Sequence, residues 1–264
     1  MTMPIRGMEN LTKNRWMTTS VLVKAGLLAG LSIIFTRVFS FMIPLAGLPA
    51  LRIGFGGLPI TMAGILFGPM VGGVVGVVAD LIGFMLNPMG GTYFPGFTLS
   101  AALTGIIPGL MFQQMRKMNQ KMNFNIVNGI GIIAFALGVI GVMWQKGALS
   151  LSQTGLLYND APLSMVVVTL FGVLVAAFVM LPVYLTQHQG KHSEHTLYSL
   201  DKITFVVTMQ YLIVSLMLNT VWLSMLFQKG VLIFLPGRIL AGFVMIPLMS
   251  MLMFSLSRLF KYIA

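Results

Sequence analysis

Long apolar runs that lack charged residues dominate this chain, and they limit the folds that it can adopt. Runs long enough to cross a bilayer, about 17–25 residues, fall at 20–44, 126–144, 163–185, 203–227 and 236–257. The stretch 54–115 is apolar throughout, but turn residues at Pro69 and at 87–96 divide it into expected helices at 56–68, 70–86 and 97–115. The sequence therefore predicts an all-α polytopic membrane bundle, one transmembrane domain over 1–264 with about eight helices.

Composition supports this fold class and excludes others. Only 8% of the residues are charged, against about a quarter in soluble domains. The absence of cysteine excludes a disulfide framework and a thiolate metal site. Residues 1–16 are polar and lack a short apolar core before a small-residue cleavage site, so no cleaved signal peptide is expected.

The net charge of +11 does not indicate nucleic-acid binding, because most basic residues flank the apolar runs. Positive residues favour the cytoplasmic side of a membrane. Of the 16 Lys and Arg residues, 11 fall inside and 5 outside when both termini are placed in the cytoplasm. The inner set is Arg6, Lys13, Arg15, Lys24, Arg116, Lys117, Lys121, Lys191, Lys202, Arg258 and Lys261; the outer set is Arg37, Arg52, Lys146, Lys229 and Arg238.

Three of the outer arginines, Arg37, Arg52 and Arg238, lie in or beside apolar runs. An arginine at membrane depth costs roughly 2.5–3.5 kcal/mol on insertion scales, so it usually faces protein or a cavity. We expect the three to share one anion-binding site. The alternative is that each side chain snorkels separately to the headgroups of the outer leaflet.

The segment "TYFPGFTLS" combines aromatic rings, a helix break and hydroxyl groups just before a predicted helix. Helix N-termini offer unsatisfied amide donors and the positive end of the helix dipole. This combination suits a flat, polar, partly anionic ligand. The alternative is an ordinary helix start with aromatic residues at the membrane interface. The candidate binding residues here are Phe94, Pro95, Gly96, Phe97, Thr98 and Ser100, with Tyr93 beside them.

Polar residues inside two apolar runs give further candidates. In "LNTVWLS", Asn219 and Thr220 need partners at membrane depth, and Trp222 can stack on a conjugated ring; helix–helix hydrogen bonds and core packing are the alternatives. Asp80 is the one acidic residue in the predicted membrane segments. It either forms a structural ion pair, the interpretation that we favour slightly, or accepts hydrogen bonds from an amino-pyrimidine ring.

Several separated motifs occur together: "RIGFGGLPI", "GPMVGGVVGVVADLIGF", "GGTYFPGFTLSAALTG", "LNTVWLS" and "LPGRIL". Over residues 20–115 and 203–260 the chain resembles the substrate-binding S component of energy-coupling-factor (ECF) vitamin transporters, most closely the folate-specific kind. The resemblance implies a six-helix core that works with a membrane coupling subunit and two ATPase subunits. It also implies that small residues on the first helix, here Ala25 and Ala29, contact the coupling subunit, although packing within the chain is the alternative.

The chain departs from this family pattern by a predicted helical hairpin at 126–185, which lies between the two matching regions. Such an insertion adds an even number of membrane crossings, so it preserves the sidedness of everything that follows. We expect the hairpin to be peripheral to the core.

Other chemistries have little support. No Walker lysine loop is present, so the chain is not expected to hydrolyse ATP itself. His188, His192 and His195 fall in a polar loop that we interpret as solvated, and no metal, cofactor or catalytic set is predicted. The expected function is capture of folate at the outside of a bacterial plasma membrane and its delivery inward. One alternative is another vitamin or a heterocyclic precursor as the substrate. The other is a membrane scaffold or regulatory protein that retains the fold, and a membrane enzyme is more distant.

Overall fold

The computed structural model describes residues 18–45, 48–88, 92–118, 124–145, 149–152, 155–158, 161–162, 198–257 and a few single residues between 169 and 184. Its helices are α1 (Thr19–Arg37), α2 (Gly57–Phe67), α3 (Pro69–Leu86), α4 (Pro95–Lys117), α5 (Phe124–Gln145), α7 (Leu200–Gln210), η1 (Tyr211–Leu218), α8 (Asn219–Phe227) and α9 (Val231–Ser257). Its strands are β1 (Ser40–Leu45), β2 (Leu48–Gly54), β3 (Leu149–Ser152), β4 (Gly155–Tyr158) and β5 (Ala161–Pro162).

The helical membrane bundle predicted from the sequence is confirmed. Within the described residues, 5 helices are long and apolar enough to cross a membrane: α1, α3, α4, the continuous helix 200–227, and α9 from 237 to 257. Two shorter apolar helices are α2 and the part of α5 that ends at residue 138. The predicted span at 163–185 lies largely outside the described residues, so the expected total of eight helices stays a prediction.

The first apolar run does not form the single helix expected over 20–44. Helix α1 ends at Arg37, and Ser40–Gly54 form an antiparallel hairpin, β1–β2, whose register shifts between Ile43 and Pro44. Hydropathy alone cannot separate a helix from an apolar strand. Pro44 opposes a helix that runs to residue 44, because its ring would clash with the carbonyl of residue 40 and it disfavours helical geometry at the residue before it. Pairing with β2 holds Ser40–Leu45 in an extended conformation instead.

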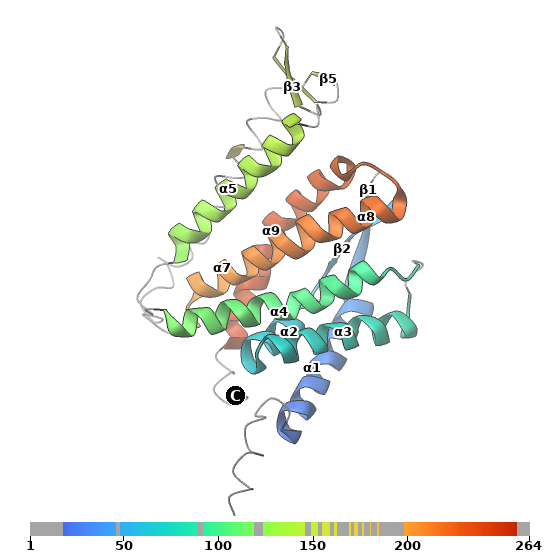
Figure 1. The fold of residues 1–264 in the computed structure, drawn as a ribbon, viewed down its shortest axis with the longest axis vertical. Coiled ribbons are helices and arrows are strands. Elements are labelled where there is room, and N and C mark those ends of the chain that lie inside the picture. The colour runs from blue at the N-terminus through green and yellow to red at the C-terminus, as the bar shows by residue number, and fades with distance from the viewer. Residues whose placement is uncertain are drawn as a thin grey trace, which may run out of the picture.

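Glycines bring α2, α3 and α4 into close contact at the centre of the bundle (Figure 1). A Cβ atom on Gly76 of α3 would lie 2.1 Å from the carbonyl oxygen of Ala101 in α4, and one on Gly105 of α4 would lie 2.2 Å from the carbonyl oxygen of Gly72. Small residues of this kind let helix backbones approach in a membrane. Their close fit fixes the start of α4 beside the second half of α3.

Ala25 and Ala29 lie inside the fold rather than on an open face. They are 8% and 6% exposed and pack in a cluster with Ile60, Ala63 and Val75 of α2 and α3. The alternative of internal packing is therefore the one seen in this structure, which corrects the expectation that these two side chains contact a partner directly. The reason is tertiary: spacing puts both alanines on one helix face, but α2 and α3 cover that face.

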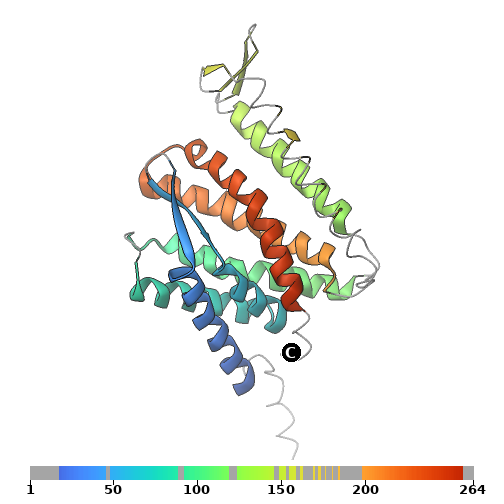
Figure 2. The same cartoon turned by 180° about the vertical axis from the view of Figure 1, so that it is seen from behind.

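Helix α5 leaves the bundle at an angle and ends near the small sheet β3–β4–β5 (Figures 1 and 2). Its first half is nevertheless attached to the core. Phe124 and Ile132 are buried in the main hydrophobic cluster, and the Phe124 amide donates a 3.0 Å hydrogen bond to Oδ2 of Asp201 at the start of α7. The beginning of the predicted 126–185 hairpin is thus part of the core packing.

Candidate ligand-binding cavity

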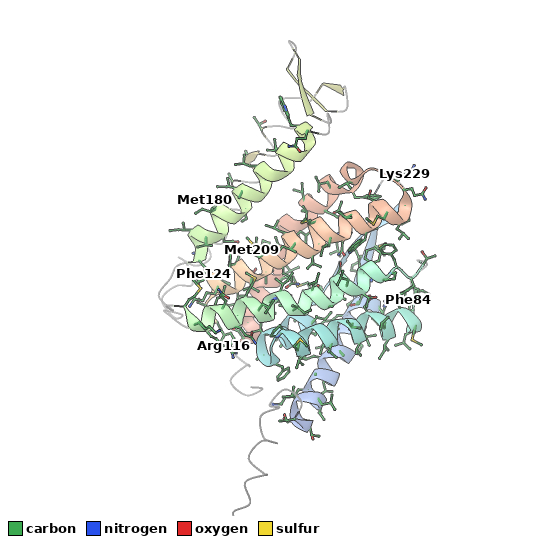
Figure 3. All side chains as sticks on the ribbon, in the orientation of Figure 1. Phe84, Arg116, Phe124, Met180, Met209 and Lys229 are labelled. Atoms are coloured by element: carbon green, nitrogen blue, oxygen red, sulfur yellow. The ribbon has the colours of Figure 1, made fainter. Side chains whose placement is uncertain are left out.

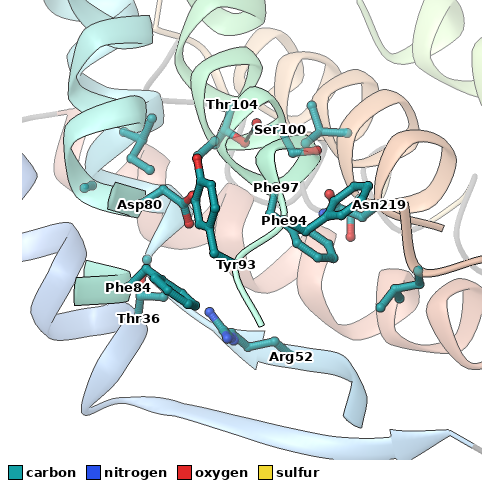
Figure 4. Close-up of a pocket in the computed structure, with 18 of the residues that line it drawn as sticks. Thr36, Arg52, Asp80, Phe84, Tyr93, Phe94, Phe97, Ser100, Thr104 and Asn219 are labelled. Carbon is teal, nitrogen blue, oxygen red and sulfur yellow. Dashed lines mark hydrogen bonds between the residues drawn. The ribbon is translucent and has the colours of Figure 1, made fainter. Parts of the chain in front are cut away.

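A cavity of about 340 Å³ opens at the end of the bundle where α3 ends and α4 begins. Its walls come from α1, the β1–β2 hairpin, α2, α3, α4, the η1–α8 segment and α9 (Figure 4). Rings and polar groups alternate around it. The aromatic residues are Phe84, Tyr93, Phe94, Phe97 and Phe227, the charged residues are Arg37, Arg52, Asp80 and Arg238, and the hydroxyl and amide residues include Ser32, Thr36, Thr92, Ser100, Thr104, Ser215 and Asn219.

The start of α4 forms an aromatic wall. Pro95 is the first residue of the helix, where its missing N–H costs nothing. The ring of Phe94 lies 5.8 Å from that of Phe97 and 6.0 Å from that of Trp222 between centroids. Gly96 allows this approach, because a Cβ there would lie 2.6 Å from Cδ2 of Trp222. Pro95 and Gly96 therefore shape the wall without lining the cavity, as does Trp222.

Asp80 on α3 is connected to the same helix start. Oγ1 of Thr98 donates a 2.7 Å hydrogen bond to Oδ2 of Asp80, and the Tyr93 hydroxyl lies 3.0 Å from the Thr98 hydroxyl. Among the residues that the structure describes, Asp80 has no ion pair, and its carboxyl group lines the cavity. The ion pair favoured from the sequence is therefore not seen among the described residues, where Asp80 instead accepts a hydrogen bond from Thr98. Thr98 is not one of the residues that line the cavity.

All three candidate arginines line this one cavity, although they come from α1, β2 and α9. Nη1 of Arg37 donates a 2.6 Å hydrogen bond to the carbonyl of Asn87, just beyond the end of α3, where a positive charge is favourable. Arg238 is 5% exposed, and its Nη1 donates a 2.6 Å hydrogen bond to the carbonyl of Ser215. Both guanidinium groups therefore line the cavity and also donate hydrogen bonds to backbone carbonyl groups.

Arg52 differs from the other two arginines because it is exposed (Figure 4). Among the described residues, no hydrogen bond or ion pair to its guanidinium is present. Partial loss of solvent lowers the pKa of Arg52, the positive charge of Arg37 lowers it further, and Asp80 opposes both. An arginine remains protonated at neutral pH in any case. Arg52 therefore places in the cavity a positive charge that has no counterion among the described residues.

The motif "LNTVWLS" divides between the cavity and the protein interior. Asn219 lines the cavity, and its Oδ1 atom is buried with no hydrogen-bond partner among the described residues. Thr220 is 1% exposed, and its hydroxyl donates to the carbonyl of Leu216 in its own helix. Nε1 of Trp222 donates a 3.1 Å hydrogen bond to the Ser100 hydroxyl. The helix-packing alternative therefore describes Thr220 and Trp222, whereas Asn219 faces the cavity.

Sequence reasoning missed the contributions of α1 and of the π-helical segment η1. Ser32 and Thr36, which are one turn apart on α1, line the cavity, and Ser215 lies one turn before Asn219. The signal for the first pair was present, since two hydroxyl residues four apart in an apolar helix fall on one face. His188, His192 and His195 lie outside the described residues.

The fold and the site together are those of a multi-pass membrane protein with a partly polar cavity at one end of a helical bundle. The family described as "ECF-type riboflavin transporter, S component" matches residues 16–186. The chain belongs to this family of transporter S components, and it is therefore a transport protein and not an enzyme. The resemblance seen in the sequence is confirmed.

Two relatives carry this comparison further. A protein of Clostridium novyi (strain NT) named folate transporter FolT is 36% identical over 128 residues, which are 48% of this chain and 69% of that protein. A crystal structure described as FolT bound with folic acid superposes with a TM-score of 0.52 at 17% identity, covering 90% of this chain and 93% of the other. At that identity the superposition supports the fold.

Proposed function

We propose that this chain is the substrate-capture subunit of an ECF-type vitamin transporter, and that its substrate is folate. The observation that carries this proposal is the composition of the 340 Å³ cavity, in which five aromatic rings stand beside three arginines. Aromatic rings stack on a flat heterocycle. Guanidinium groups pair with carboxylates in a bidentate manner, and folate ends in a glutamate that carries two of them.

Riboflavin is the alternative that the family description raises. It has a flat ring system but no carboxylate, so it leaves the positive charge of Arg52 without a counterion. The relative at 36% identity is named for folate, which agrees with the charge argument. Folate is therefore the substrate that the arginine-rich cavity favours.

The direct test is a binding panel on the purified, full-length protein by calorimetry. Folate, riboflavin and an uncharged vitamin of similar size are titrated separately. We expect tight binding of folate alone. If the protein prefers riboflavin, riboflavin is the substrate and the role as a capture subunit is retained. If none of the three compounds binds, the proposed function is wrong.

The orientation follows from the positive charges. Arg116 and Lys229 lie at opposite ends of the bundle (Figure 3), and the basic residues are more numerous on the side of Arg116. That side is the cytoplasmic one by the positive-inside rule, so the cavity opens outward in a bacterial plasma membrane and both termini are cytoplasmic. Substrate is then captured from outside and released inward.

Delivery requires an energy source that the chain lacks, because no Walker lysine loop occurs in it. We propose a membrane coupling subunit with two ATPase subunits as partners. On α1 the open positions are Gly26 and Gly30, where an added Cβ would meet nothing within 4 Å, beside exposed Leu22 and Leu27. Small residues four apart let a second helix approach closely, so this face replaces the Ala25–Ala29 face as the docking site.

A further inference from the structure

A second cavity of about 230 Å³ adjoins the first and extends toward the middle of the bundle. The two cavities share wall residues on β2, α2, α4 and η1–α8, among them Arg52, Thr104, Ser215 and Asn219. The inner chamber, as we call the second cavity, continues along α9 past Met245, Met249 and Met253. Thioether side chains pack adaptably against aromatic rings.

Two amide side chains in the wall of the inner chamber have unused hydrogen-bonding capacity. Thr61 is 3% exposed, and its hydroxyl donates a 2.9 Å hydrogen bond to Oε1 of Gln210. This bond fixes the amide so that Nε2, a donor, is the atom left over. Among the described residues, Oδ1 of Asn219 is buried and has no donor, and the half-buried Gln210 makes its hydrogen bond through Oε1, with none from Nε2. Buried polar groups in native proteins are nearly always paired, so Oδ1 of Asn219 requires a donor from a bound molecule, and the available N–H donor of Gln210 lines the same chamber.

The π-helix explains how the two amides reach the same chamber. In an α-helix with 3.6 residues per turn, residues nine apart lie two and a half turns apart and face opposite sides. Segment η1 is wound more widely, with i→i+5 hydrogen bonds such as that from the amide of Asn219 to the carbonyl of Val214. The wider turn brings Gln210 and Asn219 onto one face, and both line the chamber.

Contacts from α9 hold this wide turn in place. The Tyr211 hydroxyl donates a 2.8 Å hydrogen bond to the carbonyl of Arg238, and Nη1 of Arg238 donates one of 2.6 Å to the carbonyl of Ser215. The two bonds connect the start and the middle of η1 to the same residue of α9. The placement of the amides is therefore built into the fold and does not depend on a flexible loop.

We propose that the inner chamber holds the heterocyclic ring of the ligand, and that Gln210 and Asn219 recognise a ring edge with a carbonyl acceptor beside an N–H donor. Nε2 of Gln210 would donate to the carbonyl, and Oδ1 of Asn219 would accept from the N–H. This lactam edge occurs in 2-amino-4-oxopteridines. This proposal takes the class of ligand from the proposed function. The roles that it gives to the chamber and to the two amides do not depend on how the glutamate tail of folate is bound.

The test uses fragments of folate on the purified full-length chain. Pterin carries the ring alone, and 4-aminobenzoylglutamate carries the tail alone. We expect Gln210→Leu and Asn219→Leu each to weaken pterin binding by about ten- to a hundred-fold, and to change binding of the tail fragment by less than about two-fold. Gln113→Leu, the same chemical change at an exposed residue of α4 outside the chamber, should change neither.

Ring selectivity separates recognition from structural damage. A 2,4-diaminopteridine replaces the carbonyl acceptor by an amino group, so the native protein should bind it more weakly than pterin, and Gln210→Leu should remove most of that preference. Thr61→Val, which frees the amide without removing it, serves as a second variant if Gln210→Leu does not fold and should reduce the preference partly.

The outcomes distinguish the two proposals. If the protein binds pterin through both amides but does not bind folate, the ring-binding role of the inner chamber is supported and folate is rejected as the substrate. If the protein binds folate and neither amide variant changes the affinity for pterin, the ring-binding role of the inner chamber is wrong and folate remains the proposed substrate. Equal losses for the ring and tail fragments, or no binding of pterin to the native protein, also overturn the inner chamber.

Discussion

The hydroxyl of Thr98 donates a 2.7 Å hydrogen bond to Oδ2 of Asp80. It joins the first turn of α4 to α3 at the cavity wall, and the carboxyl group thereby meets a partner without an arginine. An intramembrane carboxyl is costly unless it is paired. The bond therefore satisfies Oδ2 of Asp80, a residue that lines the cavity, from within the fold.

Replacing Thr98 with Val should lower thermal stability, because it removes the donor to Asp80 at nearly constant volume. The expected loss is about 1–2 kcal/mol, measured as a shift in melting temperature of the purified protein. Thr98→Ser retains the hydroxyl and is the matched control. An unchanged melting temperature together with weakened ligand binding would assign the Thr98–Asp80 pair to the ligand instead.

Gly96→Ala should damage the aromatic wall. The added Cβ would lie 2.5 Å from Cε1 of Phe94 and 2.6 Å from Cδ2 of Trp222, so at least one ring has to move. We expect folate affinity to fall about ten-fold or more, since strain from overpacking typically costs 1–3 kcal/mol. Gly26→Ala makes the same change where no atom lies within 4 Å and should leave binding and melting temperature nearly unchanged. Equal behaviour of the two variants would show that the wall tolerates the shift.

The docking face on α1 predicts a separation of binding from uptake. Leu at both Gly26 and Gly30 should abolish uptake into cells that contain the coupling module, while the purified protein still binds substrate, because these positions are open. Leu at both Ala25 and Ala29 should instead lower stability and the amount of folded protein, because both residues are buried. Normal uptake by the double glycine variant would place the partner elsewhere.

Arg52→Ala should weaken folate strongly and a tail-less analogue much less. Loss of one partner of a charged, hydrogen-bonded pair typically costs 2–5 kcal/mol, which is about thirty-fold or more in affinity. Arg238→Ala should affect both ligands alike, because Arg238 holds the carbonyl of Ser215 behind the cavity. Calorimetry with two proteins and two ligands measures both effects. If Arg52→Ala weakens the binding of folate and of the tail-less analogue equally, Arg52 contacts the ring or supports the β1–β2 hairpin instead.

The membrane orientation can be measured with single cysteines, because the native chain has none. Lys229→Cys should react with an impermeant maleimide added to intact cells, and Arg116→Cys should react only after the cells are opened, since both positions are exposed at opposite ends of the bundle. The reverse pattern would invert the topology.

The sequence by itself determined the membrane bundle, the approximate boundaries of α2, α3 and α4, and several of the residues that line the candidate cavity. These features follow from local signals: uncharged apolar length requires helices in lipid, and Pro69, Pro95 and their neighbouring glycines mark where helices begin. The costly arginines pointed to a shared cavity because charge at membrane depth needs a polar environment. Arg37, Arg52 and Arg238 do line the same one.

Tertiary structure decided what local signals leave open. Hydropathy assigned residues 38–44 to a helix, but residues 40–45 pair with β2 as a strand. Spacing put Ala25 and Ala29 on one face, but only packing determined that α2 and α3 cover it. The register of η1 has no local signature either. Its wide turn is supported by bonds from Tyr211 and Arg238, residues 27 apart in sequence. Contacts between distant segments therefore set which side chains of an apolar helix face the cavity.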